Sequence, residues 1–180
     1  MSLAILLYQS DHPFAQGLFT ALLISILVFI FSFIKKGITK ATDSLVVNSG
    51  NINSILKIAL KKYNEGDIRA SINSYTKVLE IEEYNITALI SLGNIYLSNK
   101  ENYTAERYLQ ILYDEYKNKI NSSTPIIANN KNKLCIAAYK LGYLLSQRGE
   151  SSKALAIKTF SLSNSNIERE HSSLLTKYNY

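Results

Sequence analysis

The chain has 180 residues, a formal net charge of +6, no tryptophan, two prolines and one cysteine. This length leaves room for one domain and an appendage. The single Cys135 excludes an intramolecular disulfide and a cysteine-based zinc site. The 13 tyrosines and the scarcity of proline favour helices with aromatic packing.

An uncharged apolar run covers residues 14–34, after a short N-terminal segment of residues 1–13. As a helix, the run would span roughly 31 Å at about 1.5 Å per residue, which matches a bilayer core. A cleavable signal peptide is not favoured, because Met1 to Phe14 carry no Lys or Arg and no small-residue cleavage site precedes Lys35. The run therefore predicts one retained transmembrane helix, followed by a polar linker over residues 35–51.

Small residues recur at every fourth position of this run, at Gly17, Ala21 and Ser25. Rows of this kind allow a second helix to approach closely in lipid. They also arise by chance, so this face is interpreted either as a transmembrane helix contact or as an ordinary lipid-facing surface.

Charges on either side of the run indicate its orientation. Lys35, Lys36 and Lys40 follow it, whereas Asp11 and His12 precede it. Positive flanking charge remains on the cytoplasmic side of a membrane, or on the stromal side in a plastid. We therefore expect the C-terminal part of the chain on that side.

A helix–turn–helix pattern organises residues 86–119. Leu89, Leu92 and Tyr96 lie on one face of a first helix, and the small residues Gly93 and Ala105 allow a second helix to cross it closely. Similar residues recur 34 positions earlier, over residues 52–85, and 49 positions later, over residues 135–163. The extra positions form an insertion over residues 120–134, whose Ser, Thr, Pro and Asn residues predict a loop.

This pattern resembles the tetratricopeptide repeat, a helix–turn–helix unit with a period of about 34 residues. Leu89 stands at the tryptophan position of the family motif, and Lys117 stands at the proline position. The resemblance implies an all-α fold in which three repeats over residues 52–163 form a short right-handed solenoid. Residues 164–180 contain Ser165 and Glu168 at capping-box spacing, which predicts a helix that caps the solenoid.

The resemblance further implies that the first helices of the repeats line a groove for a partner. Its apolar and aromatic side chains favour a helix or an extended peptide as ligand. Some family members have a clamp of basic residues there that binds a carboxylate. In this chain that region contains Leu56, Leu60, Tyr139 and Tyr143, which argues against such a clamp. The expected groove residues are Leu56, Leu60, Tyr63, Ile90, Asn94, Leu97, Ile136, Tyr139 and Tyr143.

Basic residues dominate from Lys117 to Lys158, where Glu150 is the only acidic residue. They form either a solvated face or a docking surface for an acidic partner or an anionic membrane. No nucleic-acid-binding motif accompanies these charges. The expected docking surface consists of Lys131, Lys133, Lys140, Arg148 and Lys153.

The sequence contains no catalytic pattern. Its only histidines, His12 and His171, would lie on opposite sides of the membrane, which argues against a histidine-based triad or metal site. It also lacks a glycine-rich phosphate-binding loop. We therefore expect a non-enzymatic protein without cofactor, metal, nucleic acid or small-molecule substrate, whose partners are other proteins.

The layout of one N-terminal anchor, three repeats and a short final helix resembles a group of tetratricopeptide proteins. These are the plastid-encoded, membrane-anchored proteins of red and related algae that are linked to photosystem I assembly. The resemblance implies a scaffold on the stromal side of the thylakoid membrane that binds membrane-protein subunits or other assembly factors. Two alternatives stay open: a bacterial membrane-tethered adaptor, and an organelle import receptor with one N-terminal anchor.

The flanking lysines predict which side of the membrane the repeats occupy. Protease added to sealed vesicles with the cytoplasmic or stromal face outward should digest the repeats, and vesicles of the opposite orientation should protect them. A C-terminal tag on an immunoblot reports the digestion. The reverse pattern, or release of the chain by carbonate washing, would contradict the anchored topology.

Overall fold

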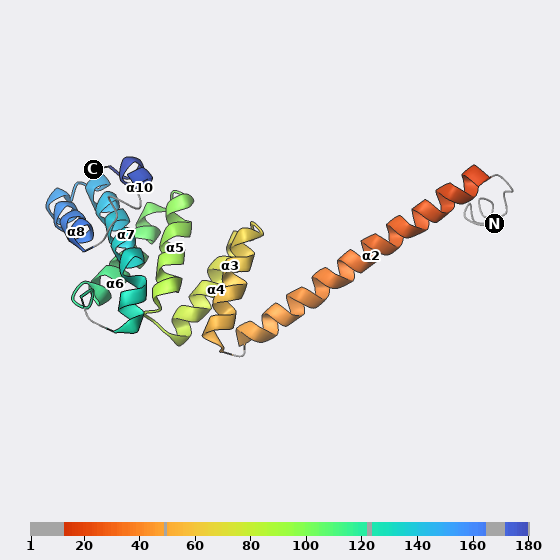
Figure 1. Cartoon of the computed structure of the whole chain (residues 1–180), viewed down its shortest axis with the longest axis horizontal. Helices are drawn as coiled ribbons and strands as arrows, with labels where there is room; N and C mark the ends of the chain where they lie inside the picture. Colours follow the sequence, from red (N-terminus) through yellow and green to blue (C-terminus); the bar gives the residue numbers. More distant parts are fainter. Residues whose placement is uncertain (1–12, 49, 122–123, 165–171, 180) are drawn as a thin grey trace. The chain divides into compact units, whose positions relative to one another are not determined.

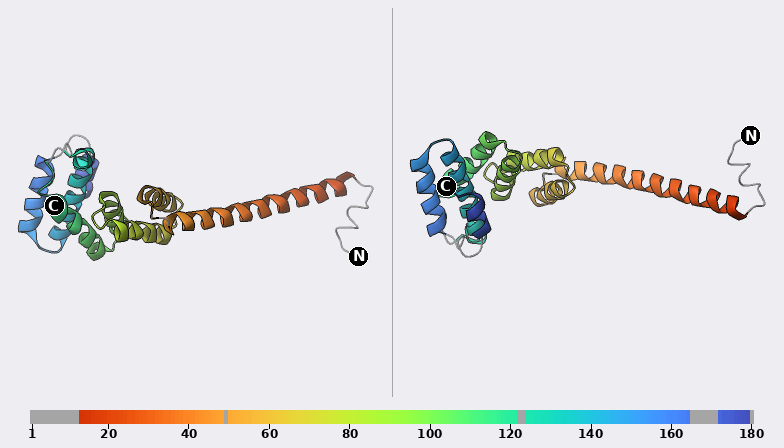
Figure 2. Two further views of the ribbon diagram at one scale, coloured as in Figure 1. Left: turned by 90° about the horizontal axis from the view of Figure 1, so that it is seen from below. Right: turned by 90° about the horizontal axis from the view of Figure 1, so that it is seen from above.

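A computed structural model of the chain describes residues 13–48, 50–121, 124–164 and 172–179. All regular secondary structure in these ranges is helical, which confirms the predicted all-α class (Figures 1 and 2). The chain divides into two compact units, Met1–Ser49 and Gly50–Tyr180. The helices are α2 (Pro13–Asn48), α3 (Ile52–Asn64), α4 (Ile68–Ile81), α5 (Ile86–Ser98), α6 (Asn102–Tyr116), α7 (Pro125–Gln147), α8 (Ser151–Ser163) and α10 (Ser172–Lys177).

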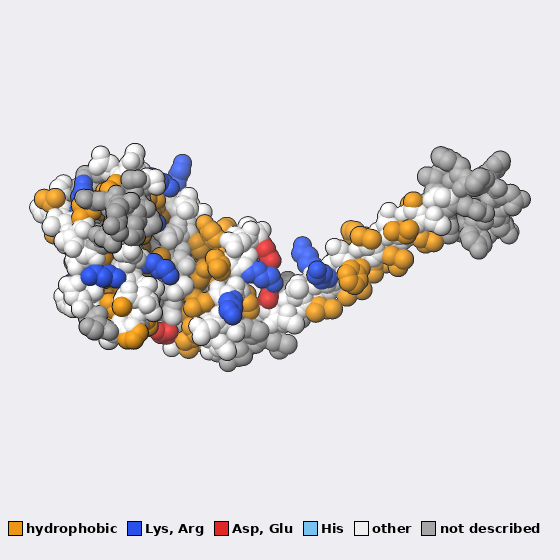
Figure 3. Space-filling view, viewed as in Figure 1, with side chains coloured by type: hydrophobic (Ala, Val, Ile, Leu, Met, Phe, Trp, Pro, Cys, Tyr) orange, Lys and Arg blue, Asp and Glu red, His pale blue; other side chains and the backbone are white. Residues whose placement is uncertain are grey.

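Helix α2 is the helix that the structure describes in the first unit. Its side chains are exposed from Thr20 to Ile38, and hydrophobic side chains line the face shown in Figure 3. The stretch Thr20–Thr39 has a mean hydropathy of 2.1 and is unburied. Within the described ranges, α2 is the one helix long and apolar enough to cross a membrane. Its apolar stretch Thr20–Thr39 begins later than the expected run 14–34.

The expected polar linker over residues 35–51 is helical as far as Asn48. No proline interrupts the chain between Pro13 and Asn48. The hydroxyls of Thr39 and Thr42 donate to the carbonyls three residues earlier, at 3.0 and 2.9 Å. Polar residues of this kind are compatible with a helix when their side chains bond to its own carbonyls.

The second unit consists of helices packed in pairs. Helix α3 packs against α4, α5 against α6, and α7 against α8. Contacts between α4 and α5 and between α6 and α7 join successive pairs, and α5 also touches α7.

The first helices of the first two pairs begin with the same cap. Asn51 accepts a hydrogen bond from the Ser54 amide at 3.1 Å, and Asn85 accepts one from the Ala88 amide at 3.0 Å. The two asparagines lie 34 positions apart. An asparagine side chain at this place satisfies an amide that has no partner within the helix.

The turns inside the three pairs also share one conformation. Gly66, Lys100 and Gly149 all have positive φ, at 79°, 64° and 89°. In each turn the next amide donates to the carbonyl five residues before it, as from Glu101 to Tyr96 at 2.9 Å. Lys100 adopts a left-handed conformation that glycine accepts more readily.

Small residues allow the paired helices to cross closely. A Cβ atom built on Gly93 would lie 2.6 Å from Cδ2 of Leu109 and 2.9 Å from its Cγ. In the first pair, the Ser71 hydroxyl donates to the carbonyl of Ala59 at 2.9 Å. Both crossings lie at the positions for which the sequence predicts small residues.

The apolar core lies along these crossings. Ile55, Ala59 and Val78 are fully buried in the first pair. One continuous cluster then extends from Ile86 on α5 to Ile157 on α8. Burial of this apolar surface is the main force that holds the pairs together.

The insertion over residues 120–134 is only partly a loop, and that prediction is wrong for its second half. Helix α7 begins at Pro125, well before the expected start of the third repeat at residue 135. Proline is well suited to the first turn of a helix, because its missing amide has no partner to lose there. Ile120, Ile127 and Leu134 are buried, so the start, the middle and the end of the segment pack against the helices.

The expected capping helix over residues 164–180 is described only as the short helix α10, Ser172–Lys177. The capping-box residues Ser165 and Glu168, and His171, lie outside the described residues. Leu175 and Tyr178 are half-buried against the core cluster.

The crossing at Gly93 predicts a large loss of stability on enlargement. Gly93→Leu should lower the free energy of unfolding by about 1–3 kcal/mol or more, because Leu109 is buried and cannot move aside. Thermal unfolding of the full chain in detergent, followed by circular dichroism, measures the change. Thr87→Leu, at an exposed position of the same helix, is the matched control; equal losses in both variants would contradict the close crossing.

Candidate functional site

Three of the expected groove residues line one recess between the first two helix pairs. Leu60 and Tyr63 come from α3, and Asn94 comes from α5. The recess has a volume of about 160 Å³ and is also lined by Tyr75, Ser91 and Ile95. Hydrophobic side chains gather over α3 and α5 on the face shown in Figure 3. This recess is the part of the expected groove that is open.

The exposure of the apolar side chains at this recess is unusual. Leu60 is 53% exposed and Tyr63 is 41% exposed, although the α3 residues Ile55, Ile58 and Ala59 are buried. Grouped exposed apolar side chains on a folded domain indicate an interaction surface. The recess can accept an apolar side chain, and the amide of Asn94 can bond to a polar group beside it.

Sequence reasoning missed Tyr75, Ser91 and Ile95 as lining residues. Tyr75 is buried and comes from α4, whereas only first helices were assigned to the groove. Ser91 and Ile95 flank Asn94 on α5, and helical spacing from Asn94 could have indicated Ser91.

Several other expected groove residues are half-buried rather than open. Ile90, Leu97 and Ile136 pack against the core cluster with part of their surface remaining accessible. Leu56 is also half-buried. These four side chains are less exposed than Leu60 and Tyr63.

Tyr139 is not a groove residue, and that prediction is wrong. Its side chain is 1% exposed and is the largest of the fully buried ones. Helix α7 contacts α5, α6 and α8, so neighbours cover more of its circumference than the sequence pattern indicates. Tyr143, one turn later, is half-buried, and its ring meets that of Tyr178 edge to face, with centroids 5.1 Å apart.

Lys140, which was expected on the basic docking surface, contacts Asn94, one of the expected groove residues. Its Nζ donates to Oδ1 of Asn94 at 2.7 Å and lies 5.8 Å from the centroid of the Tyr178 ring. Burial lowers the pKa of Lys140, and the nearby charge of Lys177 lowers it further. The half-buried ammonium group thus places positive charge at the end of the groove formed by α5 and α7.

The remaining members of the expected basic surface are largely engaged. Arg148 pairs with Glu106 of α6 at 2.6 Å and also with Glu150. Lys153 pairs with Glu150 at 2.6 Å, and Lys131 donates to Asn121 at 3.0 Å. Lys133 is exposed. Counting charges along the sequence missed Glu106, which reaches Arg148 only through the tertiary fold.

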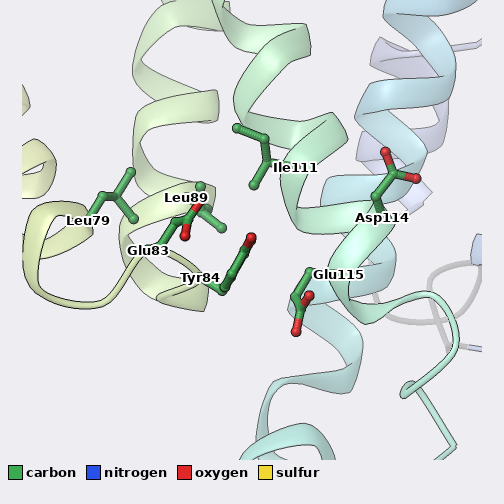
Figure 4. A pocket seen from close by; sticks show the side chains of 7 residues that line it. All are labelled: Leu79, Glu83, Tyr84, Leu89, Ile111, Asp114 and Glu115. Atoms are coloured by element: carbon green, nitrogen blue, oxygen red, sulfur yellow. The ribbon is translucent and has the colours of Figure 1, made fainter.

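A second, larger recess of about 440 Å³ lies beside the connection between α4 and α5 (Figure 4). Its apolar lining comes from Leu79, Leu89 and Ile111, and Glu83 and Glu115 add negative charge. The carboxylate of Glu83 is the main cause that raises the pKa of Tyr84.

The proposed transmembrane contact face is uncovered within this chain. Gly17, Ala21 and Ser25 are exposed, and a Cβ built on Gly17 would meet no atom within 4 Å. The Ser25 hydroxyl donates to the Ala21 carbonyl at 2.9 Å. The helix contact stays a prediction.

Among the side chains that the structure describes, no three His, Cys, Asp or Glu residues lie together in a way that could hold a metal ion. The groove instead combines exposed aliphatic and phenolic surface with one amide and one ammonium group.

The different burial of two tyrosines predicts different effects of their removal. Tyr139→Ala should lower the free energy of unfolding by about 3–5 kcal/mol, as for other large buried side chains. Tyr63→Ala, at a 41% exposed position, should change it little. Chemical denaturation of the full chain in detergent measures both. A small effect of Tyr139→Ala would show that its ring is accessible after all.

Compared with models of known protein families and with curated proteins, the chain matches none. The function therefore has to be argued from the groove and from the apolar helix α2.

Proposed function

We propose that this protein is a non-catalytic scaffold, held at a membrane by α2, that binds a segment of a partner protein in the groove. The observation that carries the proposal is the recess where Leu60 and Tyr63 remain exposed beside Asn94. An apolar side chain of a partner would remove this surface from water. The amide of Asn94 would hydrogen-bond to the partner backbone and orient it.

We propose that the three helix pairs are tetratricopeptide repeats arranged as a short solenoid. Support comes from features that recur at the repeat spacing: the caps at Asn51 and Asn85, and the left-handed turns at Gly66, Lys100 and Gly149. Stacked repeats bury a continuous core and leave their first helices available to a ligand. A groove across several pairs suits an extended or helical segment better than a small molecule.

The membrane anchor has a defined role in this proposal. A helix whose 20-residue stretch Thr20–Thr39 has a mean hydropathy of 2.1 and is unburied would hold the groove close to membrane-bound partners. Tethering raises the effective concentration of the groove toward such partners without adding a contact. Lys35, Lys36 and Lys40, toward the C-terminal end of the apolar stretch, favour the cytoplasmic or stromal side for the groove.

The client class that fits this layout best is membrane-protein subunits during assembly, and we propose photosystem I at the thylakoid membrane of a plastid. Support for this finer assignment is the layout of anchor, paired helices and final helix. The scaffold would hold a subunit or another assembly factor near the bilayer until the complex is joined.

A photocrosslinking amino acid placed at Leu60 tests the function in native membranes. It should capture protein partners, and in a photosynthetic host these should be photosystem I subunits or factors that act with them. The double variant Tyr63→Ala, Asn94→Ala should abolish capture, because it removes the aromatic surface and the amide beside the probe.

The control places the same probe at Leu155 on α8, which is 64% exposed and lies outside the groove. Capture of the same partners from Leu155 would contradict a specific groove. Capture of other protein classes at Leu60 would remove the photosystem assignment and leave the general scaffold.

A further inference from the structure

The C-terminal residues of this chain lie on the end of the groove that α7 contributes. The Tyr178 ring meets the Tyr143 ring edge to face, at 5.1 Å and an interplanar angle of 65°. Nζ of Lys140 lies 5.8 Å from the centroid of the Tyr178 ring, and the same ammonium group donates to Asn94. A segment of the chain itself therefore occupies positions at which a partner would bind.

The segment of residues 172–179 can dissociate from α7 and dock again. Helix α10 has six residues, which is too short for an isolated helix to be stable in water. Its order therefore depends on docking through Leu175 and Tyr178, which are only half-buried. An edge-to-face ring pair and a cation–π contact each change an affinity by only about two- to tenfold.

The docked segment makes aromatic contacts with α7 but brings a like charge toward Lys140. The Tyr178 ring packs well against Tyr143, yet the neighbouring Lys177 brings a second positive charge toward Lys140. Their repulsion contributes to the lowered pKa of Lys140, after burial itself. No carboxylate among the residues that the structure describes pairs with Lys140. A segment with the same aromatic ring and an acidic neighbour would fit better.

We therefore infer that residues 172–179 act as an internal competitor, docked where the partner segment binds. The partner segment that displaces them carries an aromatic residue in the place of Tyr178 and an acidic residue in the place of Lys177. This inference rests on the proposed function of the groove and adds the chemistry of its ligand. Lys140 distinguishes the two segments, because its half-buried ammonium group attracts the acidic residue of the partner and repels Lys177 of the internal segment.

Labelled peptides test the competition on the full chain in detergent, with fluorescence anisotropy as the measurement. The probe is a peptide with the sequence of residues 172–180. It should bind the Tyr178→Ala chain about tenfold more tightly than the unchanged chain, because that substitution releases the internal segment. Equal affinity for both chains would overturn the inference.

Two variant peptides test the ligand chemistry on the Tyr178→Ala chain. A peptide with Lys177→Glu should bind more tightly than the unchanged peptide, and a further Lys140→Met substitution in the chain should abolish that difference. A peptide with Tyr178→Ala should bind weakly or not at all. A Glu peptide that binds no better than the Lys peptide would contradict the proposed role of Lys140.

Two further variants of the full chain are controls for a general effect of substitution on folding. Tyr103→Ala removes a 76% exposed tyrosine of α6 outside the groove and should leave peptide affinity unchanged. Lys177→Glu in the chain itself should strengthen internal docking and reduce peptide binding, a result that unfolding of Tyr178→Ala cannot imitate. Increased peptide binding to the Lys177→Glu chain would overturn the inference.

The crosslinking probe at Leu60 separates this inference from the proposed function. Tyr178→Ala should raise capture of partners at Leu60. Equal capture with and without Tyr178 would show that the internal segment does not compete, while the groove still binds partners. Peptide competition without any capture at Leu60 would instead contradict the proposed function.

Discussion

The close crossing of the two helices within each pair is the constraint on which the rest of the second unit depends. At Gly93 there is no room for a Cβ atom beside Leu109, and in the first pair Ser71 reaches the Ala59 carbonyl. This approach buries Leu109, Ile55 and their neighbours, and it sets the direction in which the outer faces of the first helices point. Protein interiors are close-packed, so an enlarged side chain at a crossing would displace the paired helices and, with them, the outer faces of the first helices. The open recess at Leu60 is thus a product of packing elsewhere.

The two ends of the proposed groove differ in what covers them. Between α3 and α5, two large side chains stay in water. At α7, the half-buried Tyr143 and Lys140 meet Tyr178 of the chain itself. The difference follows from the neighbours of each helix: α7 is longer and contacts three other helices, whereas α3 packs mainly against α4. The two ends would therefore contribute differently to a bound segment, one through exposed apolar surface and the other through exchange with α10.

Charge in this domain is organised by tertiary contacts. Arg148 and Lys153 look unopposed in a run of basic residues, but Glu106 and Glu150 pair with them. Exposed pairs of this kind contribute little to stability, although they reduce the charge that a distant partner senses. Lys140 differs because it is half-buried and bonds to an amide rather than to a carboxylate. A half-buried positive charge with a neutral partner favours an incoming anion more than a fully solvated lysine does.

Local sequence patterns determined the helical class, the paired helices, the small residues at the crossings and the apolar helix α2. They did so because caps, turns and apolar periodicity act within a few residues, as Asn85 and Gly93 illustrate. Leu60, Tyr63 and Asn94 were also predicted together, because the resemblance to tetratricopeptide repeats implies that the first helices line a groove. Tertiary structure alone decided that Tyr139 is buried, that Lys140 bonds to Asn94, and that Tyr178 covers part of the groove. Periodicity identifies the apolar face of one helix, but the number of neighbours that cover it depends on contacts between residues distant in the sequence.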